Sequence, residues 1–304
     1  MKPETPYLIN SISEHHRILG LEKPKHPLIS VVNYGDIKSY TDERLKLKSY
    51  NFYTVSIKKG FVGKMKYGQQ YYDFDEGVMV FLSPKQVIAA ELSETIKLSG
   101  WSLLIHPDFI QPYALSKKIK EYGFFSYAVN EALHLSPEEE EMVETTMKNI
   151  RLEYDKPIDH YSQDIIVSQI ELLLNYCNRF YNRQFITRKK VNNDLLVQLE
   201  DILSDYFDKG KVKELGLPTV QDISAQLHIS PTYLSDMLRS VTGRNAQQHI
   251  TDKLMERAKE LLSTTSLSIS EIAYQLGYGY PQSFNKLFKN KTNLSPLEFR
   301  ASFN

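Results

Sequence analysis

The sequence predicts two domains, an all-β amino-terminal domain with a helical hairpin and then an all-α domain. The first observation is length, because 304 residues suffice for two domains of roughly 100 to 200 residues each. The second is a series of short runs rich in Val, Ile, Phe and Tyr between residues 26 and 106. These runs are separated by residues typical of turns, which is the pattern of β-strands in a sheet. The third is a change of pattern from residue 107 onward, where apolar residues recur at helical spacing.

Charge and composition bear on whether the protein binds nucleic acid, contains disulfides or enters a membrane. Lysine and arginine together number 37, as do aspartate and glutamate, so the net charge does not predict nucleic-acid binding. After residue 182 the basic residues exceed the acidic ones by about three, which has the sign that nucleic acid requires. The single cysteine excludes an intramolecular disulfide. The sequence shows no secretory signal and no apolar run of roughly 20 residues, so we expect a cytoplasmic protein without a membrane segment.

The amino-terminal domain is assigned to residues 1–182, as a sandwich or small barrel followed by two helices. Ser136, Pro137 and Glu139 match the capping box and first-turn proline of a helix start. A second helix is predicted from Ser162 to Asn182, and its apolar side could cover the β domain, a partner subunit or both. The residues assigned to dimerisation are Ile166, Ile170, Leu174 and Cys177. The alternative, in which all of this side belongs to the domain's own core, stays open.

A basic polar stretch at residues 183–192 is predicted to link this domain to a helical domain at residues 193–304. The helical domain contains an internal repeat. VQDISAQLHISPTYLSDMLRSVTG, from Val220, aligns with ISEIAYQLGYGYPQSFNKLFKNKTN, from Ile269, with one extra residue in the turn of the second copy. Each copy has a short helix, a tight turn and a second helix that a proline opens, which is the layout of a helix-turn-helix unit. A long helix over residues 246–262 would join the two units.

The second helix of each unit would enter the major groove of DNA. Its outward side chains are candidates for DNA contacts, because amides read adenine edges, arginine reads guanine and lysine neutralises phosphate. In the first unit the candidates are Thr232, Tyr233, Ser235, Asp236 and Arg239. In the second unit they are Gln282, Ser283, Asn285, Lys286 and Lys289. A helical bundle that does not bind DNA is the alternative interpretation.

At these residues the sequence resembles the AraC/XylS family of bacterial transcription regulators. The family signature is matched by Ile272, Ala273, Gly277, Phe284, Phe288, Lys289, Pro296 and Arg300. Tyr278, Asn293 and Lys253 depart from it, standing where phenylalanine, glycine and arginine are usual. The resemblance implies a sequence-specific regulator that binds double-stranded DNA as a homodimer, and it leaves RNA polymerase open as a further partner.

The family often carries an amino-terminal cupin-like domain that senses an effector and dimerises. The segments YDFDEGVMVFLSPKQV and GWSLLIHPDFI look similar to that domain, so the resemblance implies a cupin-like barrel and a small-molecule effector of unknown identity. The candidates for the effector-binding residues are Phe52, Tyr53, Tyr71 and Trp101. The alternative is that these aromatic residues are core, as alternating aromatics in a β domain more often are.

Two enzymatic interpretations are weighed against this one. A metal-dependent cupin enzyme needs several His, Asp or Glu ligands, yet residues 27–105 contain no histidine. A DNA-repair alkyltransferase needs a reactive cysteine, and Cys177 lies in an apolar helical stretch without activating neighbours. Nucleophile-elbow, P-loop and dinucleotide-binding motifs are also missing from the sequence. We therefore expect no enzyme activity, no cofactor and no metal site.

Overall fold

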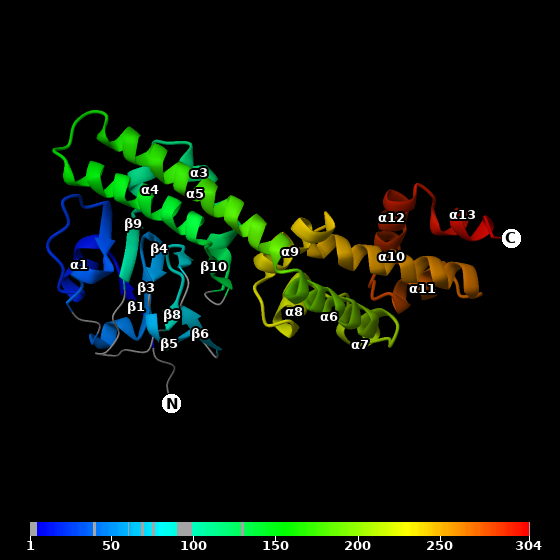
Figure 1. Cartoon of the computed structure of the whole chain (residues 1–304). Helices are drawn as coiled ribbons and strands as arrows, with labels where there is room; N and C mark the ends of the chain where they lie inside the picture. Colours follow the sequence, from blue (N-terminus) through cyan, green and yellow to red (C-terminus); the bar gives the residue numbers. More distant parts are fainter. Residues whose placement is uncertain are drawn as a thin grey trace. The chain divides into compact units, whose positions relative to one another are not determined.

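The computed structural model describes residues 5–38, 41–59, 61–67, 70–74, 77–89, 99–128 and 131–303. Contacts between residues divide the chain into an amino-terminal unit, residues 1–184, and a carboxy-terminal unit, residues 185–304. The described strands all lie in the first unit, and the second is helical (Figure 1). The predicted order of a sheet-rich region followed by a helical region is confirmed. No helix in the described part of the chain has both the length and the apolarity needed to cross a membrane.

The strands of the amino-terminal unit form three sheets. An antiparallel five-stranded sheet has the order β10-β7-β4-β9-β2, a three-stranded sheet has the order β1-β3-β8, and β5 pairs with β6. Within the described ranges the strands do not close into one barrel, which is the part of the fold prediction that is not observed. The bounds are β1 (Tyr7–Ile9), β2 (Ile29–Asn33), β3 (Leu47–Tyr50), β4 (Tyr53–Lys59), β5 (Phe61–Tyr67), β6 (Gln70–Phe74), β7 (Val78–Leu82), β8 (Ile88–Ala89), β9 (Ser99–Ile105) and β10 (Leu133–His134).

The five-stranded sheet has two faces of different chemistry, because successive side chains of a strand point to opposite sides. One face is apolar and carries Val55, Ile57, Met79, Phe81, Leu103 and Ile105. Helices α4 (Pro137–Asp155) and α5 (Ser162–Thr187) lie along this side (Figure 1). Cys177 of α5 places its Sγ 3.6 Å from Sδ of Met79, so α5 packs directly on the apolar face. Shorter helices complete the unit: α1 (Ile12–Ile18), α2 (Pro107–Ile110) and α3 (Leu115–Lys118).

Helix α5 extends beyond the predicted end at Asn182. It continues to Thr187, and after Arg188 helix α6 (Lys189–Phe207) begins, so the predicted linker is helical at all its positions but one. Local contacts explain the extension. Nε of Arg183 donates to Glu139 at 2.9 Å, and the buried Gln184 accepts a hydrogen bond from the backbone N–H of His134 at 2.8 Å. These side chains are polar, but they are held against the amino-terminal unit.

The carboxy-terminal unit consists of α6 and further helices packed around α10. The remaining bounds are α7 (Val212–Leu215), α8 (Val220–Gln226), α9 (Pro231–Thr242), α10 (Ala246–Thr264), α11 (Ile269–Gln275), α12 (Pro281–Thr292) and α13 (Pro296–Ala301). One side of α10 is buried through Ile250, Leu254, Ala258 and Leu261. Capping boxes start α8, α10, α11 and α13, as the predicted capping box of Ser136 and Glu139 starts α4.

Candidate nucleic-acid interface

Two helix pairs, α8 with α9 and α11 with α12, share the same turn geometry. After α8 the backbone N–H of Ile229 donates to the carbonyl oxygen of Ser224 at 3.0 Å. After α11 the backbone N–H of Tyr278 donates in the same way to the carbonyl oxygen of Ala273 at 3.0 Å. Ser224 and Ala273 are buried, which lets the two helices of each pair approach closely. The aligned repeat of the sequence is thus reproduced at the level of single backbone hydrogen bonds.

Each turn contains one residue in the left-handed conformation. Gly277 has φ 84° in the second pair, and the equivalent His228 has φ 56° in the first. A Cβ at Gly277 would overlap Cγ1 of Val212 in α7, so both the backbone and the packing require glycine there. The sequence identified the Gly277 turn, but it gave no sign of the strained conformation of His228, because no glycine marks that position.

The repeat extends to the ends of the second helices. Gly243 and Asn293 both adopt left-handed conformations just after α9 and α12, as expected for helix C-termini. In each case a threonine hydroxyl closes the last turn. Oγ1 of Thr242 donates to the carbonyl of Leu238 at 2.7 Å, and Oγ1 of Thr292 donates to that of Phe288 at 2.8 Å.

Helix α12 has one buried apolar side and one exposed polar side. Phe284 and Phe288 are fully buried. The predicted contact residues Gln282, Ser283, Asn285, Lys286 and Lys289 are all exposed. Neither lysine forms an ion pair with any residue that the structure describes, so both ammonium groups are available to an external anion. The exposed side of α12 therefore presents two amides and two cations together.

Helix α9 presents a less basic side. Thr232, Ser235 and Asp236 are half-buried, and Arg239 is exposed. Nη1 of Arg239 lies 3.1 Å from Oδ1 of Asp236, so part of its charge is compensated within the helix. Tyr233 is only 7% exposed and packs edge-on against Phe185, with 5.2 Å between the ring centroids. Its assignment as an outward contact residue is corrected, because its ring belongs to the core of the carboxy-terminal unit.

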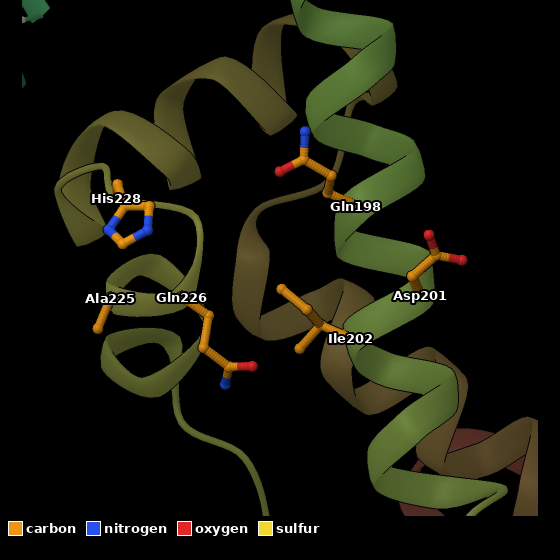
Figure 2. Close-up of a pocket in the computed structure, with 6 residues that line it drawn as sticks. All are labelled: Gln198, Asp201, Ile202, Ala225, Gln226 and His228. Atoms are coloured by element: carbon orange, nitrogen blue, oxygen red, sulfur yellow. The ribbon is translucent and has the colours of Figure 1, made fainter.

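An open groove of about 660 Å³ lies between α6 and the α8 turn, and Figure 2 shows its lining. Gln198, Asp201 and Ile202 come from α6, and they face Ala225, Gln226 and His228. None of the predicted DNA-contact residues lines this groove. It is therefore a feature separate from the polar sides of α9 and α12.

The predicted effector-binding residues do not line one pocket. Phe52 is buried beside Tyr50, whereas Tyr53 packs against Phe125 with 5.1 Å between ring centroids. Strand register places Trp101 on the same sheet face as Tyr53 and Ile57, the face that α4 and α5 cover. The side chain of Tyr71 lies outside the described residues. The prediction of a single aromatic pocket is therefore corrected, since strand alternation sends these side chains to different sides.

The predicted dimerisation residues lie in the interior of the amino-terminal unit and not on its surface. Ile166, Ile170, Leu174 and Cys177 are at most 5% exposed and pack within their own unit, so they cannot form a subunit interface. The large apolar residues that α5 leaves exposed are Ile165, Leu172 and Ile186, at 40%, 47% and 57%. Burial raises the pKa of the Cys177 thiol far above its usual range.

The two helix pairs with matching tight turns, together with the cationic outer side of α12, define a helix-turn-helix DNA-binding domain. Residues 223–302 match the family model described as a helix-turn-helix domain. This domain is of the AraC type, so the resemblance to AraC/XylS regulators is confirmed for this part of the chain.

Individual relatives agree with this assignment. The chain is 28% identical over 152 residues to YfiF, an uncharacterised HTH-type transcriptional regulator of Bacillus subtilis (strain 168), covering 49% of this chain and 45% of the relative. It is 30% identical over 115 residues to AdaA, a bifunctional transcriptional activator/DNA repair enzyme of the same organism, covering 37% and 53%. The chain thus spans about half the length of these two relatives. Among solved structures, the chain is similar to the C-terminal domain of AraT, a response regulator from Geobacillus stearothermophilus. The sequence identity is 29%, the match covers 36% of this chain and 84% of the AraT chain, and the TM-score is 0.32.

Proposed function

We propose that this protein is a sequence-specific DNA-binding transcriptional regulator. The observation that carries the proposal is the doubled helix pair, in which two turns with matching hydrogen bonds present the polar sides of α9 and α12. A domain with two reading helices would place them in successive major grooves, about 34 Å apart along the duplex. The long helix α10, whose buried side packs against both pairs, would keep their spacing fixed.

Different residues would have different roles on DNA. Gln282 and Asn285 have the donor and acceptor pairs that recognise adenine, while Lys286 and Lys289 would neutralise phosphates. In the first unit Arg239 would read guanine once DNA competes with Asp236 for its guanidinium, and Thr232 and Ser235 would contact either bases or phosphates. The second unit, with the larger cationic side, is expected to supply more of the salt-dependent affinity.

The test is selection of bound duplexes from a random pool, followed by salt titration of the selected sequence. Lys289→Ala should weaken binding to all sequences and reduce the salt slope by about 1, whereas Gln282→Ala should relax preference at one base pair. Lys120→Ala is the matched control, because Lys120 is an exposed lysine of the amino-terminal unit. If no sequence is enriched, or if Lys120→Ala lowers affinity as much as Lys289→Ala, the proposal fails.

We infer that the amino-terminal unit is an effector-sensing and dimerising domain of the cupin-like type. Support comes from its antiparallel five-stranded sheet and from the exposed Ile165 and Leu172 on α5, which lie two turns apart on one side of the helix. A second copy of the chain would bury this strip. Replacement of both residues by glutamate should give monomers in sedimentation velocity, and a dimer that persists would refute this interface. The resemblance to AraC/XylS regulators also allows RNA polymerase as a partner of this protein.

The relation to AdaA makes DNA repair the alternative function. Repair by alkyl transfer requires a cysteine thiolate that the damaged base can reach. Cys177 has no exposed surface and contacts Met79, so we infer that the chain is not an alkyltransferase of this kind. In the folded protein Cys177 should react with a thiol reagent only as fast as the unit unfolds. Rapid modification of the native protein would reopen the repair function.

A further inference from the structure

Helix α6 and the end of α5 lie outside the matched domain, yet they belong to the carboxy-terminal unit. The family model covers residues 223–302, whereas the unit begins at Phe185. Helix α6 packs against both α9 and α10. The segment that precedes the matched domain therefore contributes to the core behind α9, the reading helix of the first unit, although the repeat does not include it.

Phe185 is buried against this reading helix. It is 3% exposed, and its ring meets that of Tyr233 edge-on, with 5.2 Å between the centroids and 74° between the planes. Aromatic pairs prefer this geometry, so each ring restricts the orientation of the other. The backbone of Phe185 is fixed as well, because Nδ2 of the buried Asn192 in α6 donates to its carbonyl oxygen. Phe185 therefore gives Tyr233 a fixed support.

Tyr233 lies at the end of α9 that would read bases, because the first residues of a recognition helix contact base edges. It is the third residue of α9, and its backbone N–H donates to Oγ of the N-cap Ser230 at 3.2 Å. Successive side chains of a helix are turned by about 100°, so the direction of the Tyr233 ring determines where Thr232 and Ser235 point. A small rotation of α9 about its axis would move both side chains across the edges of the base pairs.

The second unit has no equivalent of this support. In the aligned repeat Leu234 matches Phe284, so Ser283 of α12 takes the position of Tyr233. Ser283 is exposed, whereas Tyr233 is only 7% exposed. A residue that acts through Tyr233 therefore acts on the first unit alone.

We propose that Phe185 is a positioning residue for DNA recognition by α9. Through Tyr233 it sets the rotation of α9, and thereby the bases that Thr232 and Ser235 select. Phe185 itself does not touch DNA, because it is buried. The inference rests on the proposed function, since it requires that α9 reads bases. It extends the segment that determines specificity to a residue outside the matched domain.

The test is selection from a random pool with the full-length protein and its variants. Gln282→Ala identifies the box that α12 reads, so the other box belongs to α9. Phe185→Leu and Phe185→Met both remove the ring and keep most of its volume. Each should reduce the preference for the best base over the next best in the α9 box by about fivefold or more, and leave the α12 box unchanged. The salt slope should stay the same, because no cation is lost.

Controls separate positioning from a loss of stability. A variant that is only less folded binds every sequence less tightly by the same factor, so it keeps the base preferences of the parent. Phe52→Leu truncates an equally buried phenylalanine of the amino-terminal unit and should leave both boxes unchanged. Tyr233→Phe retains the ring pair and should keep the preference of the parent. In the double variant Phe185→Leu, Tyr233→Leu the two effects should not add, because both act through one contact.

The inference is overturned if both Phe185 variants select the same α9 box as the parent, if the α12 box changes as much as the α9 box, or if Phe52→Leu has the same effect. Failure of the proposed function looks different. If the parent protein enriches no sequence, the regulator is refuted and this inference with it. If the parent enriches two boxes and the Phe185 variants read them unchanged, only the role of Phe185 is refuted.

Discussion

Gly277 and Gly243 provide a matched pair of substitutions in the carboxy-terminal unit. Both have a positive φ, 84° and 76°, so alanine at either position is strained by about 1 kcal/mol or more. Their surroundings differ. No atom lies within 4 Å of a Cβ at Gly243, whereas a Cβ at Gly277 would overlap Cγ1 of Val212 and lie 3.3 Å from the backbone nitrogen of Leu217.

The cost at Gly277 can be worked out from this difference. Val212 is 2% exposed and β-branched, so its methyl group cannot rotate away freely. Overpacking of this kind costs about 1–3 kcal/mol in addition to the backbone strain. Gly277→Ala should therefore lower the free energy of unfolding by about 2–4 kcal/mol, and Gly243→Ala by only about 1 kcal/mol.

The assay is urea unfolding followed by far-ultraviolet circular dichroism, with linear extrapolation to water. Trp101 fluorescence serves as an internal control, because it follows only the amino-terminal unit and should change little in either variant. Equal losses for the two alanine variants would refute the packing explanation and leave backbone strain as the only cost. A smaller loss for Gly277→Ala than for Gly243→Ala would contradict the structure of the α11 turn itself.

Three further predictions concern conformation, charge and DNA. His228→Gly should raise the unfolding free energy by up to about 1 kcal/mol in urea melts, because φ 56° suits glycine better than histidine. Burial lowers the pKa of Lys48 from 10.5 to about 8, so the folded state binds this proton less tightly than the unfolded state. Stability should therefore gain about 3 kcal/mol as pH rises from 8 to 10.5; Lys48→Met should remove this dependence in melts at several pH values. Asp236→Asn should free Arg239 and strengthen DNA binding at low salt, with binding titrations as the measurement.

The local features of the carboxy-terminal unit were predictable from the sequence. Capping residues, turn residues and apolar spacing act within a few positions, so the two helix pairs and the exposed side of α12 follow from them. Tyr233 could not be placed in this way. Its burial depends on Phe185, which is distant in sequence, and a helical wheel alone leaves tyrosine free to face either side.

The amino-terminal unit was less predictable because its contacts are long-range. Spacing identified an apolar side on α5, but it could not show that the sheet already buries Ile170 and Leu174 and leaves Leu172 exposed. The burial of Lys48 and Lys58 was likewise not foreseen. Lysines in strands usually lie at the surface, and only strand register shows that Lys58 shares a buried face with Ser56 and Ser102.

The capping boxes of α8, α10, α11 and α13 have a consequence for how the protein forms during synthesis. Each joins residues only three positions apart, such as Ser268 with Glu271 and Ser295 with Glu298. A helix start of this kind needs no contact with distant parts of the chain. As this half emerges from the ribosome, its helix starts are defined at once, and structures built from such local contacts fold fast.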